Sequence, residues 1–478
     1  MPQKPESKDV KDNKDGKDNK DGKDNKDTKN RGRVTKFGNF LSLLSLQSLQ
    51  SFTSLLAFLS GDAEGLRGGH AGGKAMSNGG FSVARLGRVH DVMAGFVERG
   101  DVPGLVTLVS RRGEVHVEAI GTKAVGGGGG PMERDTIFRI TSMTKPVTAV
   151  AAMILVEECR LRLDDPVDGL LPELANRRVL KRLDGPLDDT VPANRPITVR
   201  DLLTFRLGLG LLMRPPDATP IQRAEAGLRI MSFGPPVPPT PHAPDEWMRR
   251  LGTLPLMFQP GERWLYGTGS HVLGVLIARA AGQPLETFFR ERIFEPLGMR
   301  DTAFSVPAAK LDRLASCYRG DRATGALALE DGVDGSLWSW PPVFPDAGAG
   351  LVSTVDDYLA FGQMLLNQGV LGGERLLSRL SVETMTTDQM MPGQAVGAEY
   401  LPGDGAGWGF GVSIVNRRDG VAAVPGSYGW NGGFGTSWSN DPEEGMVTIL
   451  MTQRLWDTPS PPAILRDFLT SAYQAIGD

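Results

Sequence analysis

The sequence has little cysteine, with only Cys159 and Cys317 among 478 residues. Two cysteines cannot build the dense disulfide framework of a small secreted domain, and their spacing forms no Cys-x-x-Cys motif. We therefore expect two buried free thiols. The five histidines also lack metal-ligand spacing, so we expect neither a metal site nor a cofactor.

A strong charge imbalance and a long apolar run are absent as well. The formal net charge of −4 provides no basic surface for nucleic acid, which excludes that class of partner. The stretch at residues 37–60 is rich in leucine but interrupted by serine and glutamine. It is too polar to span a bilayer or to act as a signal peptide. We expect no membrane span and a cytoplasmic location.

Motifs of several common enzyme classes are missing too. No Gly-x-Ser-x-Gly sequence occurs, so the nucleophile elbow of an α/β-hydrolase is unsupported. Neither a P-loop nor a dinucleotide-binding fingerprint is present. The five consecutive glycines at 126–130 indicate a flexible loop and not a phosphate cradle.

The N-terminal part of the chain has the composition of a tail. Lys11–Gly16 repeats unchanged as Lys17–Gly22 and once more with Thr28 in place of glycine, and residues 61–80 are rich in glycine. Alternating charges with almost no apolar residues cannot bury a core, and no calcium-binding loop is completed. We expect residues 1–75 to be a disordered tail and linker, and residues 76–478 to form the folded domain.

Hydrophobic periodicity predicts the elements of the folded part. We expect helices over 83–98, 147–156, 272–281, 355–366 and 464–476, and strands over 105–110, 115–120, 409–415, 434–440 and 446–452. Thr198 has the position of an N-cap for another short helix. The pattern is that of an α+β protein with a mainly helical lobe within about residues 160–370.

A candidate nucleophile lies where a long apolar helix begins. Ser142 and Lys145 are three residues apart, which places them on one face of that helix. Burial lowers the pKa of an amine, and a neutral amine can take the proton of a serine hydroxyl. Free N–H groups at a helix start also suit a developing oxyanion.

The scarcity of lysine makes this pair informative. Of fifteen lysines, ten lie within the first 36 residues and five beyond them. At ordinary serine usage those five lysines produce about 0.3 such Ser-x-x-Lys pairs by chance. A proton acceptor must be lysine because arginine does not deprotonate. The competing interpretation is a serine near a helix start with a solvated lysine.

Two later stretches complete a pattern with Ser142. One is Trp264–Ser270, with Tyr266 before a helix, and the other is Tyr428–Thr436, a glycine-rich turn into a strand. Together with Ser-x-x-Lys they resemble the serine β-lactamase and penicillin-binding-protein superfamily. The similarity is greatest to the class C β-lactamase-like carboxylesterases, often called family VIII esterases. The resemblance implies a β-lactamase/transpeptidase-like fold, with an antiparallel sheet flanked by N- and C-terminal helices plus a mainly helical lobe.

The resemblance also implies roles for individual residues. Ser142 is the acyl-accepting nucleophile, Lys145 holds the proton network beside it, and Tyr266 shuttles the proton to the leaving group. The oxyanion hole uses the N–H groups of Ser142 and Gly433, and Gly432 lets the strand approach closely. The competing interpretation of Tyr266, read alone, is a simple core tyrosine at a helix entry. His271 lies on an apolar helix, and we interpret it as a packed or surface histidine.

The departures from the family's pattern concern substrate recognition. Lactamases and peptidases have Lys-Thr-Gly at the third motif, whereas this chain has Trp430-Asn431-Gly432. Their second motif is Tyr-x-Asn, whereas Thr268 stands here in place of that asparagine. These changes favour a serine esterase acting on a small, uncharged ester through an acyl-enzyme. A β-lactamase or D-Ala-D-Ala carboxypeptidase with the same chemistry, and a non-catalytic binding relative, remain as alternatives. The sequence leaves the oligomeric state open.

Overall fold

The computed structural model describes residues 76–478 apart from 216, 231–239, 322, 395–404 and 423. The expected disordered tail and linker at 1–75 lies outside these residues. Everything below concerns the described part of the chain.

A seven-stranded antiparallel sheet is the central element. Its order is β11-β12-β13-β14-β15-β1-β2, so an N-terminal hairpin lies beside the C-terminal strands. The strands are β1 (Gly104–Arg111), β2 (Glu114–Gly121), β11 (Ala406–Trp408), β12 (Ser413–Val415), β13 (Tyr428–Gly432), β14 (Thr436–Asp441) and β15 (Met446–Thr452). The β1–β15 pairing joins the two ends of the domain in one sheet, with Leu105 opposite Thr452.

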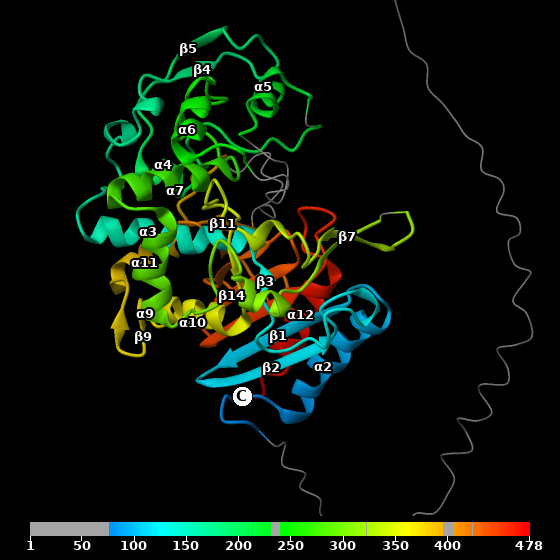
Figure 1. Ribbon diagram of the computed structural model, residues 1–478. Helices are drawn as coiled ribbons and strands as arrows, with labels where there is room; N and C mark the ends of the chain where they lie inside the picture. The colour runs from blue at the N-terminus through cyan, green and yellow to red at the C-terminus, as the bar shows by residue number, and fades with distance from the viewer. Residues whose placement is uncertain (1–75, 216, 231–239, 322, 395–404, 423) are drawn as a thin grey trace, which may run out of the picture. The chain divides into compact units, whose positions relative to one another are not determined.

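Both faces of the sheet are covered. Strands β1 and β15 are buried along their whole length, because alternate side chains enter cores on opposite sides. On one side α2 (Val83–Glu98) and α12 (Ala463–Gln474) pack on the sheet through residues such as Met93 and Phe468. Figure 1 shows α2 beside β1 and β2. On the other side lies α10 (Val355–Leu366), within the larger core.

The remaining helices and hairpins belong mostly to the middle of the chain. The helices are α3 (Thr144–Glu157), α4 (Val199–Leu203), α5 (Pro220–Leu228), α6 (Pro244–Gly252), α7 (Thr268–Ala281), α8 (Leu285–Phe289), α9 (Glu295–Leu297) and α11 (Arg379–Met385). The two-stranded sheets pair β3 (Phe138–Arg139) with β8 (Val352–Ser353), β4 (Arg178–Leu180) with β5 (Thr190–Pro192), β6 (Cys317–Gly320) with β7 (Leu327–Asp331), and β9 (Val370–Leu371) with β10 (Glu374–Arg375). Helices α4 to α7 gather on the far side of α3 from the hairpin of β1 and β2 (Figure 1).

Local sequence signals located several elements correctly. Helices α2 and α10 and strand β15 have the predicted bounds. Thr198 caps α4 through a complete capping box, in which its hydroxyl accepts from the Asp201 N–H and the Asp201 carboxylate accepts from the Thr198 N–H. Helix α7 begins at Thr268, four residues earlier than predicted, because the polar first turn has no apolar periodicity.

The predictions for one strand and one cysteine were wrong. Of the expected strand over 409–415, only β12 at 413–415 is extended, and 409–412 is the tight turn between β11 and β12, in which the Gly409 N–H donates to the Val412 carbonyl. Gly411 has a φ of +73°, and a Cβ there would lie 2.8 Å from the Lys145 carbonyl, so the turn presses directly on α3. Cys159 is exposed instead of buried, whereas Cys317 is buried as expected.

Among the described helices, none combines the length and apolar composition needed to cross a membrane.

Candidate active site

The segment that contains Ser142 is held rigidly on both sides. It leaves β3, forms a 3-10 turn over Thr141–Met143 and continues into α3. Thr141 has a φ of +41°, which is uncommon for a β-branched residue and indicates local strain next to the nucleophile. The Tyr358 hydroxyl of α10 donates to the Met143 carbonyl at 2.7 Å. Ser142 itself is half-buried.

Lys145 lies within hydrogen-bond distance of the serine. Its Nζ is 3.0 Å from Ser142 Oγ and donates to the Gly348 carbonyl at 2.7 Å. The side chain is only 3% exposed. Burial lowers the pKa of this amine to about 7, and the field of Asp346 opposes that fall. A large part of the Lys145 population is therefore neutral near pH 7 and able to accept a proton.

Tyr266 stands over the same amine from the start of α7. Lys145 Nζ lies 4.6 Å from the centre of its ring. Burial raises the pKa of the Tyr266 phenol above its ordinary value, although hydrogen bonds with Ser142 and Trp430 act in the opposite direction. Tyr266 is thus a neutral phenol at pH 7, and Lys145 is the better base.

Trp430, in β13, contacts Tyr266 directly. Its indole N–H donates to Tyr266 Oη at 2.8 Å. The two rings belong to a buried aromatic cluster with Phe205, Trp264 and Trp408, in which the Trp408 and Trp430 rings meet edge to face at 4.7 Å. The donor beside the tyrosine is therefore neutral and is surrounded by apolar rings.

The two other predicted recognition residues are placed differently. Asn431 follows Trp430 in the strand, so its side chain points to the opposite face, where its carbonyl oxygen accepts from Ser437 Oγ at 2.7 Å. Thr268 is the first residue of α7 and is 1% exposed.

The two glycines at the end of β13 have different surroundings. A Cβ on Gly432 would collide with Thr436 Oγ1 and with the carbonyl of Ile140, two residues before Ser142. The strand can therefore approach the nucleophile's turn only with glycine at this position. A Cβ on Gly433 would meet nothing within 4 Å, so open space lies beside its backbone.

The sequence interpretation missed a carboxylate and a histidine in this site. His271 Nδ1, on α7, is 2.7 Å from Asp346 Oδ1. Despite its burial, Asp346 has a lowered pKa, because His271, the Gly348 N–H and Lys145 all favour its ionised form. The only local signal was the position of Asp346 immediately before a glycine-rich segment, since His271 lies 75 positions away in the sequence.

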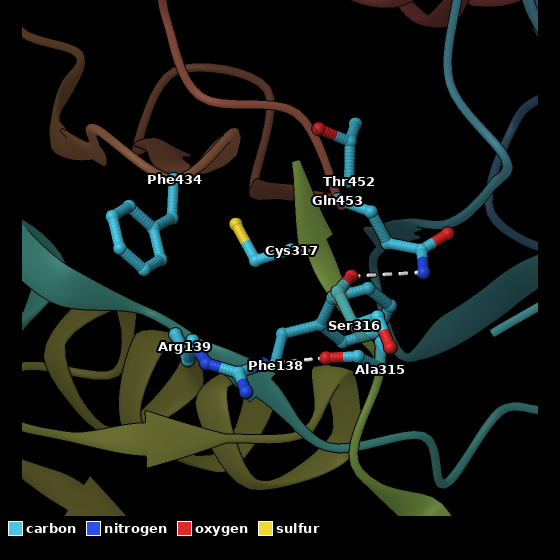
Figure 2. Close-up of a pocket in the computed structure, with 8 residues that line it drawn as sticks. All are labelled: Phe138, Arg139, Ala315, Ser316, Cys317, Phe434, Thr452 and Gln453. Carbon is cyan, nitrogen blue, oxygen red and sulfur yellow. Dashed lines mark hydrogen bonds between the residues drawn. The ribbon is translucent and has the colours of Figure 1, made fainter. Parts of the chain in front are cut away.

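A second buried ion pair supports the segment from behind. The Arg139 guanidinium, three residues before Ser142, donates to Asp331 and also to the Ala315 carbonyl at 2.5 Å. The adjoining cavity holds about 10 Å³, room for about one water molecule. Figure 2 shows Arg139 and Gln453 bonded to carbonyls at its wall, beside Cys317 and Phe434. Burial raises the pKa of the Cys317 thiol to about 12, so it is an unreactive packing residue.

In the described part of the chain, no three histidine, cysteine or carboxylate side chains gather closely enough to hold a metal ion. The amine of lowered pKa and the neutral phenol beside Ser142 are groups that suit nucleophilic attack by a serine.

Comparison with known proteins gives consistent matches. The model of the Beta-lactamase family matches residues 89–467. Protein Rv1367c of Mycobacterium tuberculosis (strain ATCC 25618 / H37Rv) is 39% identical over 374 residues, covering 75% of this chain and 88% of the relative. Esterase EstB of Burkholderia gladioli is 31% identical over 380 residues, with the same two coverages of 75% and 88%. The solved structure of EstCE1, a hydrolase with promiscuous acyltransferase activity, is similar with a TM-score of 0.66 at 25% identity, covering 83% of this chain and 99% of its own.

Proposed function

We propose, from the premise that this chain belongs to the Beta-lactamase family and is a serine hydrolase of that fold, that it cleaves small carboxylic esters through an acyl-enzyme on Ser142. The observation that carries the proposal is the 3.0 Å separation of Lys145 Nζ and Ser142 Oγ. The amine is buried, and its pKa is lowered to about 7. A serine beside an amine that is neutral at working pH is an activated nucleophile.

In the first half-reaction, Ser142 Oγ attacks the ester carbonyl carbon and its proton moves to Lys145 Nζ. The carbonyl oxygen becomes an oxyanion in front of the N–H groups of Ser142 and Gly433. Collapse of this intermediate breaks the bond to the alkoxy oxygen. The leaving alkoxide takes a proton from Tyr266, which is replenished from Lys145, and the acyl group stays on Ser142.

In the second half-reaction, a water molecule attacks the acyl-enzyme. The proton of that water passes to Lys145 by way of Tyr266, which gives its own proton to the amine as it takes the new one. Collapse of the intermediate breaks the bond to Ser142 Oγ, which takes the proton back from Lys145, and the carboxylic acid leaves. Tyr266 suits this relay because its phenol is neutral and its oxygen is fixed by the indole of Trp430. The cycle is balanced without any cofactor.

The substrate class follows from the uncharged donor at Trp430. A substrate carboxylate inside a half-buried cleft must be paired, or it loses much of its hydration free energy. The position that faces Tyr266 offers an indole N–H instead of an ammonium, and the Asn431 amide points to the other face of β13. An ester without a carboxylate meets no such penalty, and a flat aromatic alcohol can lie against the indole.

The test compares two substrates on one preparation of the full chain. We expect kcat/KM for p-nitrophenyl butyrate to exceed that for nitrocefin, which has the carboxylate of a β-lactam, by at least about a hundredfold. This ratio corresponds to about 2.7 kcal/mol of differential transition-state binding. Ser142→Ala should reduce ester turnover to background, and a fluorophosphonate should label Ser142 in the unsubstituted chain.

Two variants and three outcomes make the test decisive. The double change Trp430→Lys with Thr268→Asn should narrow the gap between the substrates, whereas Trp430→Phe, which adds no charge, should leave the gap wide. Faster turnover of nitrocefin than of the ester would replace the esterase by the lactamase alternative. Full activity of Ser142→Ala would refute the acyl-enzyme, and no labelling or turnover with any substrate would favour the non-catalytic alternative.

A further inference from the structure

His271 and Asp346 form an ion pair that no step of the proposed reaction uses. The 2.7 Å contact joins α7, which begins beside Tyr266, to the segment that precedes β8. Both side chains are largely shielded, with 21% of His271 and 15% of Asp346 exposed. A shielded carboxylate needs a counter-charge, so the question is which group supplies it.

The carboxylate is connected to the base by a single glycine. Asp346 Oδ1 accepts from the Gly348 N–H at 2.7 Å and from the Ala349 N–H at 3.2 Å. The carbonyl of the same Gly348 accepts from Lys145 Nζ at 2.7 Å. A Cβ on Gly348 would lie 2.9 Å from His271 Cε1, so only glycine fits tightly between the pair and the amine.

His271 and Lys145 thus both interact with one carboxylate. The field of Asp346 acts on both Lys145 and Tyr266. An unpaired Asp346 would stabilise the ammonium form of Lys145, which has no lone pair and cannot take the serine proton. His271 lowers the pKa of Asp346 through its charge and its hydrogen bond, and it does so without touching the reacting atoms.

We propose that His271 is a positioning residue, which as the counter-ion of Asp346 leaves Lys145 neutral and aimed at Ser142. This inference rests on the proposed role of Lys145 as the base. The carboxylate fixes the Gly348 peptide, the peptide carbonyl fixes Nζ, and the His271 ring holds the carboxylate. The same pair therefore determines both the orientation and the protonation state of the base.

Other charged groups on the neighbouring elements are engaged elsewhere or exposed. On the elements that pack around His271 and Lys145, Glu286 of α8 is exposed. Other charged side chains there form ion pairs with one another or with neighbours: Arg200 with Asp164, Asp201 with Arg195, Asp245 with Arg279, Glu246 with Arg249 and Arg250, Arg290 with Glu291 and Glu295, Arg292 with Glu158, and Arg379 with Glu383. The titratable neighbour that shares the site is the phenol of Tyr266, and Trp247 and Phe344 pack against the imidazole as neutral rings.

The test measures how pH controls the reactivity of Ser142. The full chain is labelled with a fluorophosphonate between pH 5 and 9, the adduct is located by mass spectrometry, and kcat/KM for p-nitrophenyl butyrate is measured in parallel. The acid limb of both profiles reports protonation of the base in the free enzyme. The variants are His271→Gln, which removes the charge, His271→Lys, which keeps it, and Asp346→Asn.

The expected shifts have opposite signs. His271→Gln should move the acid limb up by about one pH unit, because the freed carboxylate holds a proton on Lys145. Asp346→Asn should move the limb down by a similar amount. His271→Lys should restore the limb to near its original position. The control is His90→Gln, which breaks the exposed 3.1 Å pair with Glu118 away from the site and should move nothing.

If the pair were merely structural, its loss in the variants would lower the melting temperature and leave the acid limbs of the two pH profiles in place. Limbs that do not move in folded His271→Gln, or that move the same way in His271→Gln and Asp346→Asn, overturn the inference. If Asp346→Asn does not fold, the opposite effects of His271→Gln and His271→Lys still decide it. Failure of the proposed function is distinguishable, since Ser142 would then remain unlabelled in the unsubstituted chain.

Discussion

Lys145, the base in the proposed reaction, destabilises the fold, and this cost can be measured. Lys145→Met replaces a buried amine with an uncharged side chain of similar volume. In the unfolded chain the amine has its ordinary pKa of 10.5, and in the folded chain burial lowers that pKa to about 7. The unfolded state therefore binds more protons between these two values.

The magnitude and its sign follow from that difference. Below pH 7 the full penalty applies, and as pH rises from 7 to 10.5 the penalty disappears because the unfolded amine loses its proton as well. At pH 7 the penalty is about 4 kcal/mol, and at pH 10 it is about 1 kcal/mol. The methionine leaves the Gly348 carbonyl without the donor at 2.7 Å, which costs about 2 kcal/mol. The variant should thus be more stable than the unsubstituted chain by about 2 kcal/mol at pH 7 and less stable by about 1 kcal/mol at pH 10.

Chemical denaturation at the two pH values measures this change of sign. Ester hydrolysis by Lys145→Met should fall by several orders of magnitude at both. The control is Lys310→Met, which removes an ammonium paired with Asp301 at 2.7 Å and should lose stability at both pH values. An unfolding free-energy difference for Lys145→Met that is the same at pH 7 and pH 10 would show that the amine is not neutral in the folded chain, and the reasoning would fail.

Two further predictions concern the third motif. Trp430→Phe keeps an aromatic ring but removes the indole donor to Tyr266 Oη. In steady-state kinetics, kcat for ester hydrolysis should therefore fall about tenfold with little change in KM, and an unchanged kcat would mean that the indole only packs. Gly432→Ala should abolish turnover and lower the melting temperature, because the added Cβ collides with Thr436 Oγ1. Gly433→Ala should keep the melting temperature, and equal melting temperatures for the two variants would contradict this reasoning.

Short-range patterns were sufficient for much of the molecule. The bounds of α2, α10 and β15 and the capping box at Thr198 were predictable because periodicity and caps depend on residues within one or two turns. The pairing of Ser142 with Lys145 was predictable for the same reason, since a spacing of three fixes their relative direction once the segment is helical.

Glycine-rich segments concealed the strands. The strand β13, over Tyr428–Gly432, was interpreted as a turn because glycine has a low β propensity, yet hydrogen bonds from β12 and β14 on its two sides hold it extended. The turn at 409–412 was hidden as well, because the need for glycine at 411 arises only from its packing against α3, where a Cβ would lie 2.8 Å from the Lys145 carbonyl.

The chemical state of the site was decided by the tertiary structure alone. The sequence identified an amine beside a serine, but the depressed pKa of Lys145 comes from burial by elements distant in the chain. The indole that bonds Tyr266 comes from β13, the Gly348 carbonyl that orients the amine comes from the segment before β8, and the His271–Asp346 pair joins α7 to that segment. Local spacing fixes which groups are neighbours along one helix, whereas burial and long-range charge pairing fix which of them hold a proton.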